Sequence, residues 1–394
     1  MKKILTINSG SSSIKFALFD ADANLKKELY GKIDRIGLSD TELTYHDLVT
    51  HKTGRLIIGN TSAVHFLIDW LKEYIDIGSI SGIGHRVVHG MNHTEPEIVS
   101  KELIDELKSI SSYDPDHLPQ EIEMIELFRK LYPGTFQLAC FDTSFHTSMP
   151  RIAKLLPLPR RYDTMGIQRY GFHGLSYAYL MEELTSVAGN ETAKGKIILA
   201  HLGNGASLAA VKDGKSIDTS MGFTPTSGLV MGTRTGDLDP GVAWFMMQSE
   251  KFNAEQFSNL INHQSGLLGI SETSSDMQDL LKLQLKDNRA AEAVELFCYQ
   301  TKKWIGSFAT VLGGLDTLIF SGGIGENAPE VRSKICNNLE FLGIELDEQK
   351  NMENDAIICT DASRVNVRVI KTNEELMIAK MVCDVLNKGN NYHK

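Results

Sequence analysis

The stretch KKILTINSGSSSIKFALFD (Lys2–Asp20) has a counterpart halfway along the chain in KIILAHLGNGASLAAVKD (Lys196–Asp213). Each stretch has an apolar run, a polar turn that contains glycine, and a second apolar run, which is the pattern of a β-hairpin. When the two are superposed, Asn8 falls on His201, and a glycine follows two residues later in each. The recurrence predicts a duplicated fold whose second half begins near the middle of the chain.

Strand-like and helix-like segments alternate along most of the chain, which favours an α/β fold. A second echo links SGIG (Ser81–Gly84) with SGGIG (Ser321–Gly325), each after a short apolar segment and each late in its own half. Because short glycine matches also arise by chance, this echo supports the duplication only together with the hairpins. Apolar residues at three- and four-residue intervals predict helices over residues 61–75, 119–132, 288–312 and 372–388.

The length of 394 residues exceeds what one hydrophobic core usually supports, so we expect two domains. The proline-rich segment Met149–Asp163 is the expected crossing, because proline limits helix formation and stiffens the chain. We therefore expect an N-terminal lobe over residues 1–150, completed by the C-terminal helix 373–394, and a second lobe over residues 151–372.

The composition is that of an ordinary globular protein, with 42% hydrophobic and 23% charged residues. The formal net charge of -10 arises from interspersed acidic and basic residues, which argues against a nucleic-acid or membrane-surface partner. No uncharged apolar stretch approaches the roughly 18 residues of a membrane span, and the N-terminus lacks the apolar region of a signal peptide. The five cysteines are dispersed and form no C-x-x-C pair, so we expect reduced thiols and a cytoplasmic location.

Three loops that contain glycine follow strand-like segments: NSGSSS (Asn8–Ser13), HLGNG (His201–Gly205) and SGGIGENAPEVR (Ser321–Arg332). Free backbone N–H groups at a strand end can bind phosphate, and glycine lets a nucleoside approach closely. The P-loop and G-x-G-x-x-G patterns are absent, and AAVKDGKS (Ala209–Ser216) is better explained by a hairpin turn at DGK. Although most glycine turns are only turns, three such loops favour nucleotide binding.

Two arginines, an aspartate and a histidine form a plausible set for phosphoryl transfer. Arg86 lies in the apolar, glycine-rich GHRVVHG, where a guanidinium needs an anionic partner. Arg234 lies between glycines in MGTRTGDLDPG, Asp142 follows an apolar strand in FDTSFH, and His173 ends RYGFH. Arginine and imidazole donors can stabilise the charge of a transferring phosphoryl group. The alternative is that each residue is structural and that Arg86 makes an ordinary ion pair.

Two further patterns have simple structural explanations. The histidines of the segment His85–His93 recur at four-residue steps, but the intervening glycines and valines favour a strand and turn over a helical zinc site. In TNEEL, Thr372 and Glu375 match a capping box at a helix start, which leaves Glu374 for another role. We expect this carboxylate to hold Mg²⁺ through water.

Nine motifs occur along the chain in an order that is typical of one family: NSGSSSIK, GHRVVHG, FDTSFH, RYGFHG, HLGNGASL, MGTRTGDLDPG, SGLLGIS, SGGIGENAPEVR and TNEEL. On these motifs the chain resembles the acetate kinases over nearly its whole length. The resemblance implies the duplicated actin/Hsp70-like (ribonuclease H-like) α/β fold, with two lobes and an interdomain cleft. It also implies reversible transfer of phosphate from ATP to acetate, giving acetyl phosphate and ADP, with Mg²⁺, for which Mn²⁺ can substitute, in a homodimer joined through the second lobe.

The resemblance also implies roles for residues at matching positions. Arg86 and Arg234 would clamp acetate and the transferred phosphoryl group, and His173 would stabilise the transition state. Asp142 would serve the carboxylate acceptor by orienting cationic groups, because a carboxylate needs no base. The remaining assignments are Asn8 and Glu374 for magnesium; Val88, Phe172 and Pro225 for the acetate pocket; Ser11, Ser13, Lys15, His201, Leu202, Gly203, Asn204 and Gly205 for the ATP phosphates; and Asp276, Met277, Gln278, Gly323, Ile324, Gly325, Glu326 and Asn327 for adenosine.

Four departures from the family pattern bear on substrate preference. DPDHLP replaces APLHNP, so Asp116 stands where a leucine normally lines the pocket for the acetate methyl group. An unpaired carboxylate there would be costly, so the loop is shifted, Asp116 turns away or pairs with a cation, or the acid differs from acetate. Ser227 replaces a glutamate, Leu175 and Tyr177 alter GFHGTSH, and Glu272 replaces a glycine after GIS.

Two alternatives remain open at this stage. A kinase of propionate or another short carboxylic acid is suggested by Asp116. A non-catalytic actin-like nucleotide switch would need the glycine loops but not Arg86, Arg234 and Asp142.

Overall fold

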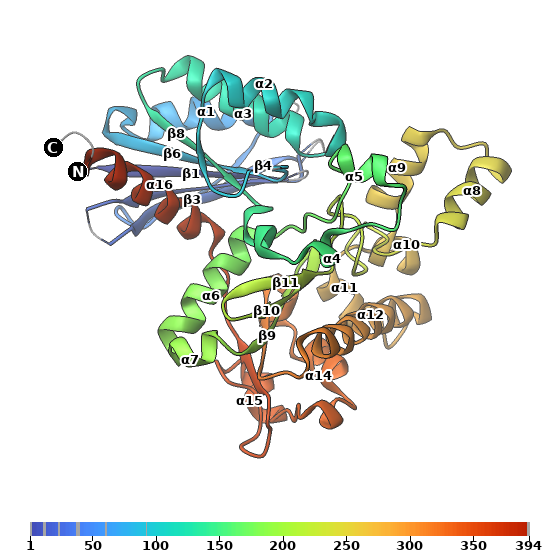
Figure 1. Cartoon of the computed structure of the whole chain (residues 1–394). Helices are drawn as coiled ribbons and strands as arrows, with labels where there is room; N and C mark the ends of the chain where they lie inside the picture. The colour runs from blue at the N-terminus through green and yellow to red at the C-terminus, as the bar shows by residue number, and fades with distance from the viewer. Residues whose placement is uncertain are drawn as a thin grey trace. The chain divides into compact units, whose positions relative to one another are not determined.

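The computed structural model describes residues 2–10, 13–22, 24–36, 40–59, 61–91 and 93–391. The chain forms two compact units, and Figure 1 labels their helices and strands. Unit 1 comprises Met1–Ser144 and Asn373–Lys394, and unit 2 comprises Phe145–Thr372. Among the helices described, none is long and apolar enough to cross a bilayer.

Unit 1 is built on an eight-stranded sheet of order β5-β4-β3-β2-β1-β6-β8-β7. Its strands are β1 (Lys3–Ser9), β2 (Ser13–Asp20), β3 (Lys26–Asp34), β4 (Glu42–Asp47), β5 (Lys52–Ile57), β6 (Ile80–Val87), β7 (Glu97–Ile98) and β8 (Phe136–Phe141). Its helices are α1 (Ala63–Tyr74), α2 (Lys101–Ser109), α3 (Leu118–Leu131) and α16 (Glu374–Asn391), with short 3₁₀ turns at Ile77–Ser79 and Ser111–Tyr113.

Strand β6 separates the two helical layers of unit 1. Its residues alternate between faces, as in any strand. A Cβ built on Gly84 would lie 2.3 Å from Ile378 Cγ2 of α16, whereas the ring of the next residue, His85, meets Phe128 of α3 at 5.6 Å. Glycine at position 84 therefore lets α16, drawn in dark red in Figure 1, pack directly against the strand.

Unit 2 is built on a five-stranded sheet of order β11-β10-β9-β12-β13. Its strands are β9 (Lys196–Leu202), β10 (Ala206–Lys212), β11 (Lys215–Thr219), β12 (Thr317–Ser321) and β13 (Asn366–Val369). Its longer helices are α6 (Gly174–Ala188), α8 (Pro240–Ser249), α9 (Ala254–His263), α12 (Asn288–Leu312) and α14 (Pro329–Cys336). Shorter helices are α4 (Arg151–Lys154), α5 (Arg160–Thr164), α7 (Asn190–Ala193), α10 (Gly266–Ser271), α11 (Met277–Leu283), α13 (Gly322–Asn327) and α15 (Glu348–Glu353), with 3₁₀ turns at Ser144–Ser148 and Glu340–Leu342.

The five strands β3-β2-β1-β6-β8 of unit 1 repeat in unit 2 as β11-β10-β9-β12-β13. In each set the first three strands are antiparallel and the last two run parallel to their neighbours. The hairpins close at equivalent places, where Ser9 pairs with Ile14 and Leu202 with Ala206. The predicted duplication and the predicted actin/Hsp70-like α/β fold are therefore confirmed.

The hairpin turn expected at DGK is also present. Asp213 and Gly214 join β10 to β11 with φ angles of 52° and 72°, values that suit a two-residue hairpin turn.

The sequence match between SGIG and SGGIG does not correspond to a shared structure. Ser81–Gly84 lies inside β6, whereas Ser321–Gly325 begins at the end of β12 and enters α13. The glycines of β6 make room for α16, whereas Gly322 adopts a φ of 75°, and a Cβ there would lie 2.7 Å from Leu202 O. The two motifs serve different purposes at positions that do not correspond.

The predicted capping box at the start of α16 is wrong. The helix begins at Glu374, and the side chain of Asn373 accepts the Leu376 N–H at 3.1 Å. Thr372 instead contacts the Ser176 hydroxyl, with 2.7 Å between the two oxygens. Asn373 caps the helix because its short side chain can accept a backbone N–H in the first turn, which leaves Glu375 free to contact β1.

Candidate active site

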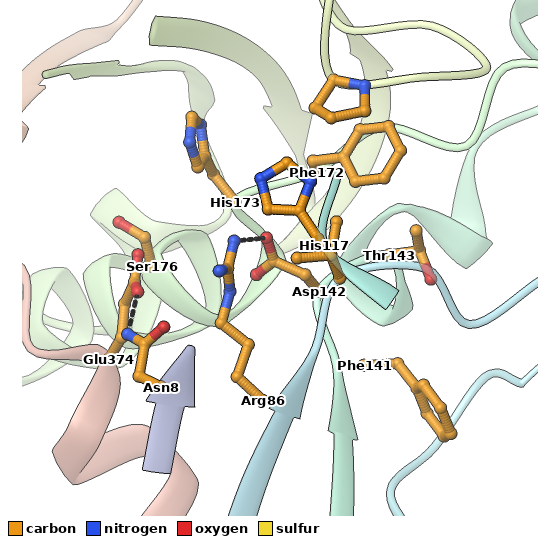
Figure 2. A network of polar contacts seen from close by, with 12 residues as sticks. Asn8, Arg86, His117, Phe141, Asp142, Thr143, Phe172, His173, Ser176 and Glu374 are labelled. Carbon is orange, nitrogen blue, oxygen red and sulfur yellow. Dashed lines mark hydrogen bonds and ion pairs between the residues drawn. The ribbon is translucent and has the colours of Figure 1, made fainter. Parts of the chain in front are cut away.

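In unit 1 the ends of two parallel strands bring Arg86 and Asp142 together. Arg86 lies one residue before the end of β6. Asp142 directly follows β8, which runs parallel to β6. Arg86 Nη2 donates to Asp142 Oδ2 at 2.8 Å (Figure 2). Arg86 Nη1 donates to Ser9 O at 3.2 Å. Asp142 is fully buried, and the Arg86 side chain is only 13% exposed. The anionic partner predicted for Arg86 is thus present within the protein itself.

The surroundings of Arg86 keep it charged. Burial disfavours the charged guanidinium, but Asp142, then Glu374 and Glu121, raise the pKa of Arg86 above its ordinary value. A permanently charged guanidinium can bind a carboxylate or phosphate in two-pronged geometry. The ion pair with Asp142 fixes the orientation of the Arg86 guanidinium.

Asn8, at the end of β1, lies beside the start of α16. Its Nδ2 donates to Glu374 Oε2 at 2.7 Å and to Glu375 Oε1 at 3.3 Å. Figure 2 shows the first of these bonds. One amide and two carboxylates at one point supply the oxygen ligands that magnesium prefers. These residues therefore fit a divalent cation, and Glu375 belongs to the group that sequence reasoning had assigned to a cap.

The first phosphate loop is described in part. Ser11 lies outside the described residues. Lys15 on β2 pairs with Asn8 on β1 and is exposed, and Ser13 opens β2. The Lys15 ammonium is therefore carried on the strand next to Asn8, the hydrogen-bond partner of Glu374 and Glu375.

A buried acidic group lies behind the strand end that carries Arg86. Glu121, in the first turn of α3, accepts the Val88 N–H with Oε2 at 3.0 Å, while its Oε1 is buried and has no hydrogen-bond partner among the described residues. Burial, opposed by Arg86 and the Val88 N–H and reinforced by Asp114 and Asp142, raises the pKa of Glu121 to about 8. Sequence reasoning missed Glu121, because its contact with Val88 spans 33 residues.

The loop DPDHLP places its two acidic residues differently. Asp114 is buried and its Oδ1 lies 2.8 Å from His117 Nδ1. Asp116 is half-buried and is engaged by other residues, so it is not the unpaired carboxylate that would be costly beside a methyl group. Two other departures also have local partners: Ser227 packs against Gly222, and Glu272, at a φ of 54°, pairs with Arg289 at 2.6 Å.

In unit 2, His173 occupies the N-cap of α6 in a left-handed conformation, with φ 59° and ψ 25°. Gly171, two residues earlier, also has a positive φ, and this sharp turn directs the imidazole toward β9 and β10. Its Nδ1 lies 2.8 Å from Ser207 Oγ, and its ring stacks on His201 with centroids 4.2 Å apart. His201 is held in turn by Ser176 Oγ, 2.8 Å from its Nδ1.

In unit 2 the side chains of His173 and Arg234 both approach Gly205. A Cβ built there would lie 3.3 Å from His173 Nε2 and 4.0 Å from Arg234 Nη1. Arg234 Nη1 also donates to Pro225 O at 3.2 Å, so Pro225 lies against the same guanidinium. Two nitrogen donors above a residue without a side chain form a suitable cradle for an oxyanion.

The glycines of HLGNG lie close to those of SGGIGEN. A Cβ on Gly203 would lie 3.8 Å from Gly323 N, at the start of α13. Glu326 Oε1 accepts the Gly322 N–H at 2.9 Å and the Thr372 N–H at 3.1 Å, and so ties this short helix to the chain that leaves unit 2. The loops after β9 and β12 thus meet at one sheet edge, as parallel strands require.

A buried arginine, Arg332, donates a hydrogen bond to a backbone carbonyl of α13. Arg332 is fully buried and donates to Gly325 O at 2.9 Å, to Asn351 Oδ1 at 2.8 Å and to Asn354 Oδ1 at 2.7 Å. Burial lowers the pKa of Arg332 to about 10, which leaves it charged at neutral pH. Arg332 ends the motif SGGIGENAPEVR, but the sequence alone indicated no role for it.

The remaining predicted adenosine residues have local roles in the structure. Asp276 is the N-cap of α11 and accepts the Gln278 N–H at 2.8 Å, and Met277 is buried. Asn327 Nδ2 donates to Gly323 O at 2.9 Å. Leu202 and Asn204, which were predicted to contact the ATP phosphates, flank Gly203 in the β9–β10 hairpin, where Leu202 is buried.

His85 and His93 have partners within the protein. His85 is buried, its Nε2 lies 2.9 Å from Gln137 Oε1, and burial lowers its pKa to about 4. His93 Nδ1 lies 2.5 Å from Glu97 Oε1. In the part of the chain that the structure describes, no three His, Cys, Asp or Glu side chains are placed to hold a metal ion.

Known proteins resemble this chain over nearly its whole length. The model of the acetokinase family matches residues 3–380. The acetate kinase of Thermoanaerobacterium thermosaccharolyticum is 42% identical, over 96% of this chain and 97% of that protein. A propionate kinase of Francisella tularensis has a TM-score of 0.91 at 36% identity, covering 98% of this chain and all of that one, and the acetate kinase of Porphyromonas gingivalis has a TM-score of 0.87 at 36% identity, with the same coverage. The chain belongs to the acetokinase family.

Proposed function

We propose that this chain is an acetate kinase, which transfers phosphate reversibly between ATP and acetate by direct in-line displacement. The observation that carries the proposal is the convergence of His173 Nε2 and Arg234 Nη1 on Gly205, in a unit whose glycine loops suit a nucleotide. A nucleotide switch would need the loops but would have no use for an arginine and an imidazole donor next to one glycine. The family membership agrees with this choice.

The reaction is mainly a matter of position and charge. Acetate is already anionic and needs no base, so the enzyme must bring two anions together and neutralise the charge that develops on the phosphoryl oxygens. Arg86, oriented by Asp142 at 2.8 Å, would bind the acetate carboxylate. Arg234 and His173 would donate to the phosphoryl group.

The metal in this reaction would be Mg²⁺, or Mn²⁺ in its place. Asn8, Glu374 and Glu375 would hold it, directly or through water, because they supply hard oxygen ligands at one point. When bound, the cation neutralises the phosphate charge of ATP. The residues Ser13 and Lys15 on the neighbouring strand would assist in phosphate binding, as would Ser11.

The preferred acid is expected to be acetate, with propionate or another short acid as the second candidate. Val88 and Phe172 are both buried. With Pro225 they are the apolar residues that the family resemblance assigns to a short acyl chain. The second candidate is favoured by the likeness to the Francisella propionate kinase. One methylene in an apolar pocket changes kcat/KM by about 10- to 200-fold, so the two acids can be told apart.

The test is acyl phosphate formation. Purified protein, Mg-ATP and hydroxylamine should give hydroxamate with acetate, propionate and butyrate in that order of kcat/KM. Propionate ahead of acetate would select the second candidate. No hydroxamate with any of the three acids, or ATP turnover that ignores them, would refute the proposal.

A homodimer through unit 2 is part of this proposal. Helices α8 and α9 have no buried residue, and α8 carries Trp244 and Phe245 at 67% and 64% exposure. Aromatic side chains presented in this way suit contact with a second copy. Sedimentation of the wild type and of Trp244→Glu would show a dimer that the variant loses.

Because ATP and ADP are metabolites of the cytoplasm, we place the enzyme there.

A further inference from the structure

We propose that Tyr177, acting through Ser207, fixes the tautomer of His173 so that its Nε2 carries the proton. The inference rests on the proposed function, in which His173 donates to the phosphoryl group. It assigns a positioning role to a tyrosine that stands where the family motif GFHGTSH has histidine.

The three side chains form a continuous polar chain. Tyr177 OH lies 2.5 Å from Ser207 Oγ, and Ser207 Oγ lies 2.8 Å from His173 Nδ1. Tyr177 and Ser207 are both fully buried, so water does not compete for these bonds. The tyrosine ring packs in the core between α6 and the sheet, among residues such as Leu180 and Ile197, which leaves its hydroxyl with a fixed direction.

Two directions of donation satisfy these distances. In the first, Tyr177 donates to Ser207 and Ser207 donates to Nδ1, so a neutral His173 carries its proton on Nε2. In the second, Nδ1 donates to Ser207 and Ser207 donates to Tyr177, so Nε2 presents a lone pair. Which nitrogen is protonated is set by the bond that the other nitrogen makes.

The surroundings of Nε2 select the first direction. Nε2 faces Gly205, on the same side as Arg234 Nη1. A phosphoryl oxygen at this place would accept a hydrogen bond from Nε2–H and would be repelled by a lone pair. A phenol is also a better donor than an aliphatic hydroxyl, which favours donation from Tyr177 to Ser207.

The tautomer can be read directly. In protein labelled with ¹⁵N-histidine, at about pH 8 where an ordinary imidazole is neutral, long-range ¹⁵N–¹H spectra should show His173 protonated on Nε2, assigned with His173→Gln. Tyr177→Phe keeps the ring and removes the hydroxyl, and should shift His173 toward Nδ1 protonation. A wild-type His173 protonated on Nδ1, or no change in Tyr177→Phe, would overturn the inference.

Kinetics provide the second readout. Loss of one buried hydrogen bond should lower kcat of Tyr177→Phe about tenfold, with the KM values for ATP and acetate nearly unchanged. Tyr177→His keeps a donor and should restore most of the rate. The matched control is Tyr74→Phe, which removes a hydroxyl bonded to Asp47 in unit 1 and should leave kcat unchanged. A Tyr177→Phe enzyme with the kcat of the wild type would contradict the assignment.

A second variant covers the case in which Tyr177→Phe does not fold. Ser207→Ala removes the middle of the chain and should produce the same change of tautomer and the same loss of kcat. A wild type that is inactive with every acid would refute the proposed function, but the spectra would still decide the tautomer.

Discussion

Replacing Glu121 with glutamine should stabilise the protein at high pH and leave it nearly unchanged at low pH. The Glu121 carboxyl is buried, accepts the Val88 N–H, and has its pKa raised from 4.5 to about 8. Because the folded-state pKa is the higher one, its contribution to stability is complete below pH 4.5 and is lost as the pH rises toward 8. Glutamine does not titrate and can still accept the Val88 N–H.

The size of the effect follows from the shift. At about 1.4 kcal/mol per pH unit, the free energy of unfolding of the wild type should fall by about 4 kcal/mol relative to Glu121→Gln between about pH 5 and pH 8. For a unit of this size, that corresponds to a change of about 10 °C in the difference between the two unfolding midpoints.

Calorimetry of the full chain at several pH values measures this difference. The control is Glu123→Gln on the same helix, whose side chain is 48% exposed and should give no such trend. Hydrogen exchange at the Val88 amide gives a local readout, which should remain protected in Glu121→Gln. If the difference between Glu121→Gln and the wild type were the same at pH 5 and pH 8, Glu121 would not carry a proton in the folded protein.

Three other substitutions test separate parts of the site. Glu374→Gln should raise the Mg²⁺ concentration for half-maximal rate by about 10- to 100-fold, and an unchanged magnesium titration would remove Glu374 from the metal site. Arg332→Met should release the carbonyl of Gly325 and raise the KM for ATP severalfold while the KM for acetate stays constant; equal changes in both would indicate general damage. Gly205→Ala should lower kcat by about 10- to 100-fold in a folded protein, because its Cβ would lie 3.3 Å from His173 Nε2, and a normal kcat would show that no anion binds there.

The fold was predictable because its signals are local. An apolar run, a glycine turn and a second apolar run specify a hairpin wherever they occur, and two copies of the pattern implied the duplication that β1–β2 and β9–β10 display. The helical periodicity over residues 288–312 likewise gave the bounds of α12.

What the sequence could not give depends on contacts between distant segments. The glycines of β6 look like a loop motif in the sequence. In the structure, Gly84 is needed because Ile378, almost 300 residues later, packs against the strand there. Glu375 fitted a capping box on spacing alone, yet Asn8 is its partner. Glu121 is an ordinary helical glutamate until burial next to Val88 changes its protonation.

The central claim is that two guanidinium groups act in one phosphoryl transfer, and a double-mutant cycle on kcat tests it most directly. Arg86→Lys and Arg234→Lys keep the positive charge and remove the two-pronged donor geometry. We predict that each lowers kcat by about 100-fold and that the double variant loses far less than the product, because residues that act as a unit are not additive. Either lysine variant with the kcat of the wild type, or losses that simply multiply, would contradict the account.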